Sequence, residues 1–237
     1  MPTPGTPEPS PGAEHYFATD PTSASQPRLL TLHLPEGPLV LGSDRGVFAP
    51  EAVDVGTRYL LLDAPMPAAN STGTYLDLGC GYGPIAVALA RRCPDARVLA
   101  VDVNRRALEL CRDNAARAGV ANVQVLSPEE VPASVTLDGL YANPPIRIGK
   151  AALHTMLSTW LARLNPGAKA VLVVHKHLGA DSLQRWLQSQ GHPSARLGSR
   201  LGYRLLQINA NTSRPTPTAD PTADPTAAPA PDPDRNP

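Results

Sequence analysis

The stretch LDLGCGYGP, residues 76–84, places three glycines between an apolar segment and a helical one. Glycine permits a tight bend and a close approach of the backbone to a ligand, and the free N–H groups of the following helix point at that ligand. The spacing is not GxGxxG, because Pro84 stands where a dinucleotide fold needs its last glycine or alanine. Asp77, on the strand side, would repel a pyrophosphate, so the turn better suits a cationic or amine-bearing ligand.

Strand-like and helix-like segments alternate around this turn. One strand leads into the glycine turn. Further strands are expected in 97–103, 122–127, 137–143 and 168–175, and one or two more in 195–209. Helices are expected in 53–64, 84–93, 104–119, 150–167 and 180–191. Such alternation builds a mainly parallel α/β sheet with helices on both faces and ligands at the carboxyl ends of the strands. Residues 27–48 alternate apolar and polar side chains around a Pro-Gly turn, which predicts a small β-hairpin before the main domain.

The two ends of the chain differ in composition from the middle. Residues 1–13 and 210–237 are rich in proline with little to bury, and we expect both to be disordered tails flanking one domain in 14–209. The formal net charge is zero, but residues 1–27 carry three negative charges and 210–237 a net two, which leaves five positive charges on the body. This balance suits a phosphate-bearing partner and equally suits a solvated surface.

Cysteine and histidine spacing gives no metal or disulfide pattern. Cys80, Cys93 and Cys111 form no CxxC pair, and no carboxylate or cysteine spacing makes His175 or His177 a metal ligand. We therefore expect no metal and a reducing compartment. The start MPTPGTPEPS has neither the charged nor the apolar region of a secretory signal, and no apolar run reaches the length of a membrane span. A soluble cytoplasmic protein is the expectation.

An acidic residue follows the glycine turn at an informative distance. Asp102 ends the next expected strand, near the separation of about 20 residues at which a carboxylate accepts hydrogen bonds from ribose hydroxyls. The glycine turn and Asp102 together predict a site for a nucleoside-bearing ligand.

These residues resemble the signature of the class I S-adenosylmethionine-dependent methyltransferases, whose acidic-x-Gly-x-Gly-x-Gly turn is matched by Asp77, Gly79, Gly81 and Gly83. Within them the chain is similar to the small-domain group of the ribosomal RNA small subunit methyltransferase C type, which modifies the exocyclic amine of guanine. The supporting stretches are HYF (15–17), RGVFAPEAVDVGTRYLL, NPPIRIGK, KHLGADSL and GYRLL. The resemblance implies a Rossmann-like sheet with an antiparallel last strand, S-adenosylmethionine as cofactor, and ribosomal RNA or a ribosomal subunit as partner.

The resemblance also assigns roles to residues beyond the glycine turn. Asp102 matches the ribose-binding acid, and Gly56 and Thr57 are expected to close over the donor. Ser127 stands where relatives carry Asp or Asn for the adenine, and Ile146 stands where amine methyltransferases commonly carry an aromatic residue.

The Asn143-Pro144-Pro145 turn ends the strand expected next to the glycine turn. An exocyclic amine is a poor nucleophile because its lone pair is delocalised. The Asn143 side-chain oxygen and the Pro144 carbonyl can each accept one of its hydrogens, which aims the lone pair at the methyl group and stabilises the developing positive charge. The prolines fix the turn beforehand.

Three basic residues are expected on the rim of this turn. Arg147 and Lys150 follow the prolines, and Lys176 follows an apolar strand, so all three either hold RNA phosphates or are simply solvated.

The leading hypothesis is methylation of a guanine amine in ribosomal RNA. Methylation of a protein glutamine or of an adenine amine, which also use Asn-Pro-Pro turns, and a non-catalytic RNA- or nucleotide-binding domain are the alternatives; the sequence leaves the oligomeric state open.

Overall fold

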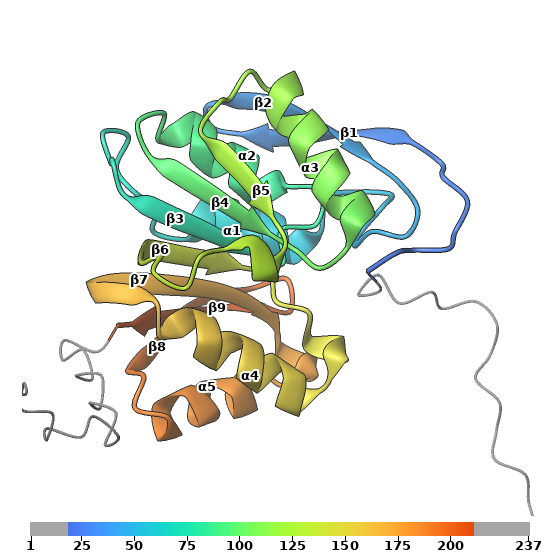
Figure 1. The fold of residues 1–237 in the computed structure, drawn as a ribbon. Coiled ribbons are helices and arrows are strands. Elements are labelled where there is room, and N and C mark those ends of the chain that lie inside the picture. Colours follow the sequence, from blue (N-terminus) through green and yellow to red (C-terminus); the bar gives the residue numbers. More distant parts are fainter. Residues whose placement is uncertain (1–18, 211–237) are drawn as a thin grey trace, which may run out of the picture.

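A computed structural model of the chain describes residues 19–210. The tails expected at 1–13 and 210–237 lie outside the described residues, apart from Ala210, and so does the HYF stretch at 15–17. The remainder forms one seven-stranded sheet with helices on both faces and a separate two-stranded hairpin (Figure 1).

The large sheet has the strand order β5-β4-β3-β6-β7-β9-β8. Its strands are β3 (Thr74–Leu78), β4 (Arg97–Val101), β5 (Val123–Leu126), β6 (Leu137–Ala142), β7 (Leu164–His175), β8 (Ser194–Arg200) and β9 (Tyr203–Asn209). The first five are parallel, whereas β9 runs antiparallel to both β7 and β8. The expected Rossmann-like sheet with its antiparallel last strand is confirmed, and the 195–209 segment forms two strands.

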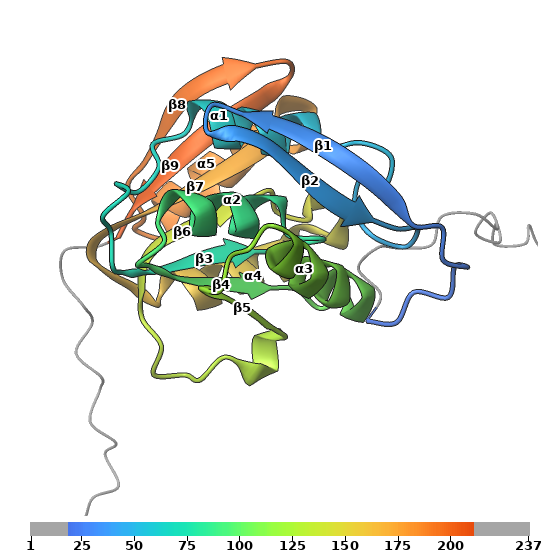
Figure 2. The same cartoon turned by 90° about the horizontal axis from the view of Figure 1, so that it is seen from above.

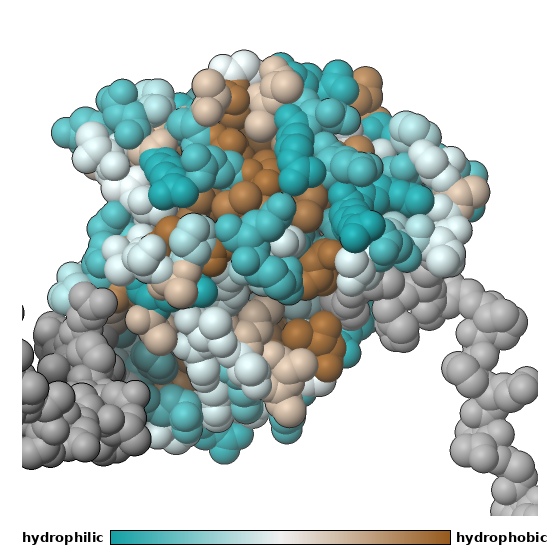
Figure 3. All heavy atoms as spheres, in the orientation of Figure 1, coloured by the Kyte–Doolittle hydropathy of each residue, from teal (hydrophilic) through white to brown (hydrophobic). Residues whose placement is uncertain are grey.

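Two apolar layers cover the sheet. On one face lie α1 (Val55–Asp63), α2 (Pro84–Arg92) and α3 (Arg105–Arg117), and on the other lie α4 (Lys150–Leu161) and α5 (Ala180–Ser189). Short 3-10 turns occur at η1 (Pro128–Glu130), η2 (Ile146–Ile148) and η3 (Lys176–Leu178). Around this core the surface is largely hydrophilic, with apolar residues near the middle of the face seen in Figure 3.

The hairpin of β1 (Arg28–Leu34) and β2 (Gly37–Ser43) extends the first apolar layer. Alternate side chains are buried, as the sequence predicts for a half-buried pair of strands. The hairpin lies on the side of α2 and α3 that faces away from the sheet (Figure 2). It therefore encloses helices that would otherwise be half exposed.

A buried amide fastens the hairpin to the glycine turn. Asn114 of α3 accepts a hydrogen bond from Gly42 N–H at 2.6 Å, and its Nδ2 donates to the carbonyl oxygens of Gly42 and Tyr82 at 2.8 Å each. The side chain is fully buried. Since Tyr82 belongs to the glycine turn, one side chain joins β2, α3 and the turn.

The helix expected over 150–167 is shorter than the prediction. It ends at Leu161, and Leu164 already pairs with Leu137 as the first residue of β7. Apolar periodicity continues through Leu164 and so extends the helical pattern, but pairing with β6 decides the conformation. Pro166 is tolerated because the β6–β7 register shifts there, between Leu137 and Gly139, and no ladder N–H is needed.

Replacing Asn114 by alanine is expected to lower the free energy of unfolding by about 3 kcal/mol, because three buried or partly buried backbone groups lose their partner. Urea unfolding followed by circular dichroism measures the change. Asn70→Ala, at an exposed loop position, is the control and should stay within about 0.5 kcal/mol of the parent. An Asn114 variant as stable as the control would contradict this account of the hairpin.

Candidate active site

Two turns meet where β3 and β6 end. The strands are parallel neighbours, with Asp77 opposite Tyr141, so the glycine turn after β3 and the Asn-Pro-Pro turn after β6 leave the sheet side by side. A Cβ atom built on Gly79 would lie 3.7 Å from Pro145 Cδ. The two features that the sequence singled out are therefore in contact range.

A cavity of about 940 Å³ opens at this edge of the sheet. It runs from the glycine turn and Asp102, past Asn143, to the 3-10 turn η3. Its lining is mostly apolar, with a few polar groups, as is usual for sites that hold flat organic ligands. Of the residues expected to bind cofactor or to act in catalysis, those that line it are Gly79, Gly81, Asp102, Asn143, Pro144 and Pro145.

The glycine turn presents its backbone to this cavity. Gly79, Gly81 and Gly83 all have positive φ, which other residues adopt at a cost. A Cβ on Gly81 would meet no atom within 4 Å, so that glycine leaves open space. A Cβ on Gly83 would lie 2.5 Å from Cys111 Sγ, so Gly83 instead serves the packing of α2 against α3.

Asp102 lies next to the glycine turn, directly after β4. Its Oδ2 accepts from Gly81 N–H at 2.8 Å and its Oδ1 accepts from Asn104 N–H at 3.0 Å. Burial raises the pKa of this carboxyl, while the backbone hydrogen bonds oppose the rise. A carboxylate held in this way keeps further lone pairs for hydroxyl donors of a ligand.

Asp77 is fully buried behind the turn and does not line the cavity. Its Oδ2 accepts from Ala86 N–H in the first turn of α2 at 2.8 Å, and its Oδ1 has no hydrogen-bond partner among the described residues. Burial raises its pKa to about 8, and the nearby charge of Asp102 adds to the rise. In this structure the carboxyl fastens the turn to the helix rather than facing a ligand directly.

Asn143 faces the cavity from the end of β6. Its Nδ2 donates to Asp54 Oδ2 at 2.8 Å and to Thr57 Oγ1 at 3.1 Å. The Pro144 carbonyl accepts from Ile146 N–H at 2.8 Å, which uses one of its two lone pairs. The turn therefore offers an amide oxygen and a half-occupied carbonyl.

The segment before α1 supplies the partners of Asn143. Asp54 is the N-cap of α1 and lines the cavity, and Thr57 is buried beside it and reaches a small adjoining pocket. Gly56 does not line the cavity, because it faces the ring of Tyr203. Sequence reasoning named Gly56 and Thr57 but missed Asp54; an aspartate followed three residues later by threonine at a helix start was the available signal.

The far end of the cavity differs in part from the prediction. Of the four residues expected to contact the substrate, Ile146 and Arg147 line the cavity, whereas Lys150 and Lys176 do not. His175, His177 and Leu178 line it instead, around η3. His175 meets Tyr203 edge-on at 5.0 Å between ring centroids and His177 at 5.6 Å.

Ser127 does not line the cavity either, although its neighbour Pro128 does. Its backbone N–H donates to Glu130 Oε2 at 2.7 Å in a capping box that begins η1. In this structure the residue shapes the turn beside the cavity.

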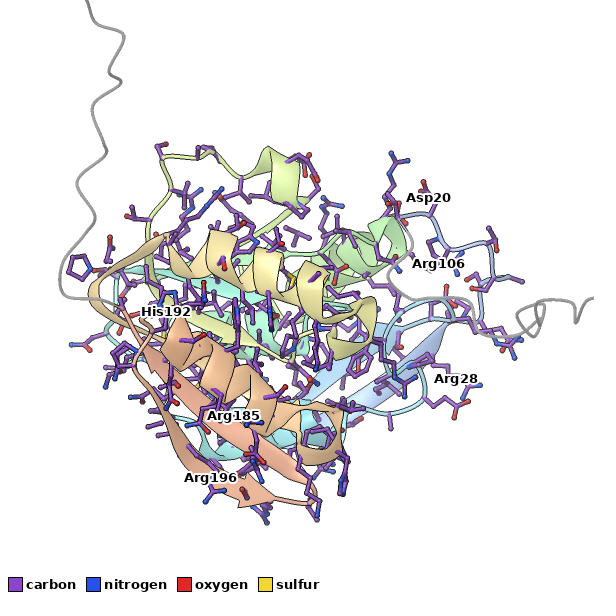
Figure 4. All side chains as sticks on the ribbon, turned by 90° about the horizontal axis from the view of Figure 1, so that it is seen from below. Asp20, Arg28, Arg106, Arg185, His192 and Arg196 are labelled. Carbon is purple, nitrogen blue, oxygen red and sulfur yellow. The ribbon has the colours of Figure 1, made fainter. Side chains whose placement is uncertain are left out.

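An N-terminal segment, residues 19–27, supports the loop that forms one wall. Arg106 of α3 donates to the Arg45 carbonyl at 2.8 Å and to Ser23 Oγ at 3.3 Å. Asp44 accepts from Ser25 Oγ at 2.6 Å and from Gln26 N–H. Figure 4 shows Asp20 of this segment near Arg106, away from Arg185 on α5 and Arg196 on β8. The segment thereby fixes the loop from Val47 to Pro50, which lines the cavity.

The described part of the chain contains no group of three or more metal-ligating side chains placed to hold an ion. Within residues 19–210 no helix combines the length and apolarity needed to cross a membrane.

Comparison with known proteins gives a family match that spans the fold. A family model described as "Methyltransferase small domain" matches residues 39–206. "Uncharacterized protein YbxB" of Bacillus subtilis (strain 168) is 34% identical over 173 residues, covering 72% of this chain and 85% of that protein. "Ribosomal RNA small subunit methyltransferase C" of Shewanella pealeana is 30% identical over 62% of this chain but only 43% of its own length.

Among solved structures, a Thermus thermophilus 16S rRNA N2 methyltransferase (RsmC) in complex with AdoMet and guanosine superimposes with a TM-score of 0.64 at 21% identity. The match covers 79% of this chain and 52% of that one. This likeness shows that the two proteins share a fold.

Burial of Asp77 predicts a pH-dependent stability. Because its pKa rises from 3.8 to about 8 on folding, the native state binds more protons than the unfolded state between those values. The contribution of Asp77 to the stability of the parent should therefore fall as pH rises from about 4 to 8. Asp77→Asn lacks this titration, so its stability relative to the parent should increase across the window, by at most about 1.4 kcal/mol per pH unit.

Urea unfolding of both proteins at several pH values between 5 and 8 measures the difference. The exposed Asp95→Asn serves as control. A difference between Asp77→Asn and the parent that stays constant with pH would show that Asp77 is ionised in the native state.

Proposed function

The chain belongs to the methyltransferase small domain family, and we propose that it transfers a methyl group from S-adenosylmethionine to the exocyclic amine of a guanine in ribosomal RNA. The observation that carries the proposal is the position of Asn143, which lies beside the glycine turn with its amide nitrogen engaged and its oxygen without a partner among the described residues.

The residues around the glycine turn fit the donor. S-adenosylmethionine supplies a methyl group on a positively charged sulfur, joined to a nucleoside at one end and an amino acid at the other. Asp102 would accept from the ribose hydroxyls, and the open space beside Gly79 and Gly81 would admit the donor close to the backbone. Thr57 shares a small adjoining pocket with Gly79 and Gly81, which is too small for the amino-acid end, so the main cavity would hold the whole donor.

Asn143 and Pro144 would act on the amine that receives the methyl group. Asn143 Oδ1 and the free lone pair of the Pro144 carbonyl would each accept one N–H hydrogen, so that the nitrogen lone pair points at the methyl carbon. As the new C–N bond forms and the C–S bond breaks, positive charge develops on the nitrogen, and both oxygens stabilise it. The methylated nitrogen then loses a proton to water, so no strong base is required.

The far end of the cavity is suited to a flat base. Ile146, Leu178 and the rings of His175 and His177 offer apolar and aromatic surface beyond Asn143. The total volume, about 940 Å³, lies at the upper end for small-molecule sites, which fits a donor and a base together.

The named relatives favour ribosomal RNA as the source of that base, and the positive charge of the body is compatible with it. Arg147 in the lining would contact phosphate or base, and the exposed residues Lys150 and Lys176 begin α4 and η3 nearby. This chain spans less than half the length of the Shewanella ribosomal RNA methyltransferases that it matches and about half of the Thermus thermophilus one, so their activity, substrate and partners are proposals for it.

One labelling experiment tests the substrate. The protein is incubated with S-adenosyl-L-[methyl-³H]methionine and, separately, with small ribosomal subunits, naked ribosomal RNA and total protein. We expect label in RNA, recovered as N2-methylguanosine after nuclease digestion. Label in adenosine or in protein would replace the proposed substrate, and absence of both label and donor binding would leave only a non-catalytic domain.

Asn143→Ala is expected to lower the methylation rate by about 10²-fold or more, because the amide oxygen acts on the transition state, while donor affinity stays within about threefold. Rates are measured at saturating donor and affinity by calorimetry. Asn70→Ala should leave both values unchanged. A variant that keeps more than about a tenth of the rate would remove Asn143 from the mechanism.

A further inference from the structure

Asp54 joins three elements that are far apart in the sequence. Its Oδ2 accepts from Thr57 N–H at 3.0 Å and from Asn143 Nδ2 at 2.8 Å, and its Oδ1 accepts from the Tyr203 hydroxyl at 3.1 Å. Thr57 belongs to α1, Asn143 follows β6 and Tyr203 begins β9. Both carboxylate oxygens are therefore engaged at the wall of the proposed active site.

These contacts decide the orientation of the Asn143 amide. An ionised carboxylate only accepts hydrogen bonds, so the group that faces Asp54 must be the NH2 of Asn143 and not its oxygen. Thr57 Oγ1 accepts from the same nitrogen at 3.1 Å. Because the amide is planar, Oδ1 points away from both acceptors, and it has no hydrogen-bond partner among the described residues.

Tyr203 and Gly56 hold Asp54 in place in turn. A Cβ on Gly56 would lie 2.5 Å from Tyr203 Cε1, so only glycine lets the phenol ring come this close to the start of α1. Burial, followed by the Asp54 charge and hydrogen bond, raises the pKa of Tyr203 to about 12, which keeps the hydroxyl protonated as a donor. The edge of His175 packs against the same ring.

We propose that Asp54 is a positioning residue, which locks the Asn143 amide with its oxygen toward the methyl-accepting amine. The inference rests on the proposed function, since it assigns Asp54 a part in that reaction. The hydrogen bond from Asn143 to a charged acceptor also draws electron density toward Oδ1, which makes that oxygen a better acceptor for the amine. In this role Asp54 acts through Asn143 and not through a bond to the methyl-accepting amine.

Two variants separate this role from a structural one. Asp54→Ser keeps a good N-cap for α1 but is too short to reach Asn143. Asp54→Asn can keep its own oxygen where Oδ2 now accepts from Thr57 and Asn143, and turn its NH2 toward the Tyr203 oxygen. Orientation of Asn143 should thus be lost in the serine variant and restored in the asparagine variant.

The rate of RNA methylation at saturating donor is measured for both variants, with donor affinity by calorimetry. We expect Asp54→Ser to lose about 10²-fold in kcat with donor affinity within about threefold, and Asp54→Asn to recover at least about tenfold of that loss. Adding Thr57→Val to Asp54→Ser removes the second acceptor and should deepen the loss. A serine variant with full kcat, an asparagine variant as slow as the serine one, or a loss confined to donor affinity would each overturn the proposal; the last would indicate that the carboxylate binds the ammonium group of the donor.

A second measurement does not depend on methylation. The side-chain NH2 signals of Asn143 are assigned in a ¹⁵N spectrum by their absence from Asn143→Asp, and their exchange with water is followed. We expect slow exchange in the parent and in Asp54→Asn, and exchange at least about tenfold faster in Asp54→Ser. Fast exchange in the parent, or no change in the serine variant, overturns the orientation. If the parent methylates no RNA, the proposed function fails while this measurement still decides the role of Asp54.

Discussion

Pairing of β3 with β6 is the constraint on which the candidate site depends. The two strands lie side by side in the middle of the sheet although 58 residues of β-α units, from 79 to 136, separate them in the chain. Because the strands are parallel, the glycine turn after β3 lies next to the Asn-Pro-Pro turn after β6. The first allows a ligand to approach the backbone closely, and the second offers hydrogen-bond acceptors. Neither turn alone points to a transfer reaction, whereas the two side by side support the proposed one.

Buried polar groups then fix the shape of each turn. Asp77 ties the glycine turn to the first residues of α2, and Asn114 ties it to the hairpin. Asp54 ties the Asn-Pro-Pro turn to α1 and β9. Each of these side chains satisfies backbone or side-chain groups that would otherwise be buried without partners, so they specify geometry where apolar packing does not.

Most of the architecture was predictable because it follows from local patterns. Apolar runs of five or six residues and amphipathic helices such as α3 were predicted correctly from neighbours in sequence. The end of α4 was not predicted correctly, because the pairing of Leu164 with Leu137 overrides a helical pattern that continues past Leu161.

The residues of the candidate site likewise include some that the sequence predicts and some that it does not. Gly79, Gly81, Asp102 and Asn143 stand in motifs with recognisable spacing and do line the cavity. Asp54 and Tyr203 were not predicted, because their meaning comes from contacts with partners 89 and 149 positions away. His175 and His177 were judged only as metal ligands, and their place beside the cavity follows from the fold of η3.

The involvement of Tyr203 has a consequence for biosynthesis. This residue opens the last strand, which inserts between β7 and β8, so its hydroxyl reaches Asp54 only after nearly the whole domain has left the ribosome. A nascent chain that has formed the first five strands of the large sheet already contains both turns, yet it lacks the hydrogen bond from Tyr203 to Asp54. The complete pocket therefore forms only after β9 has been synthesised and has paired with β7.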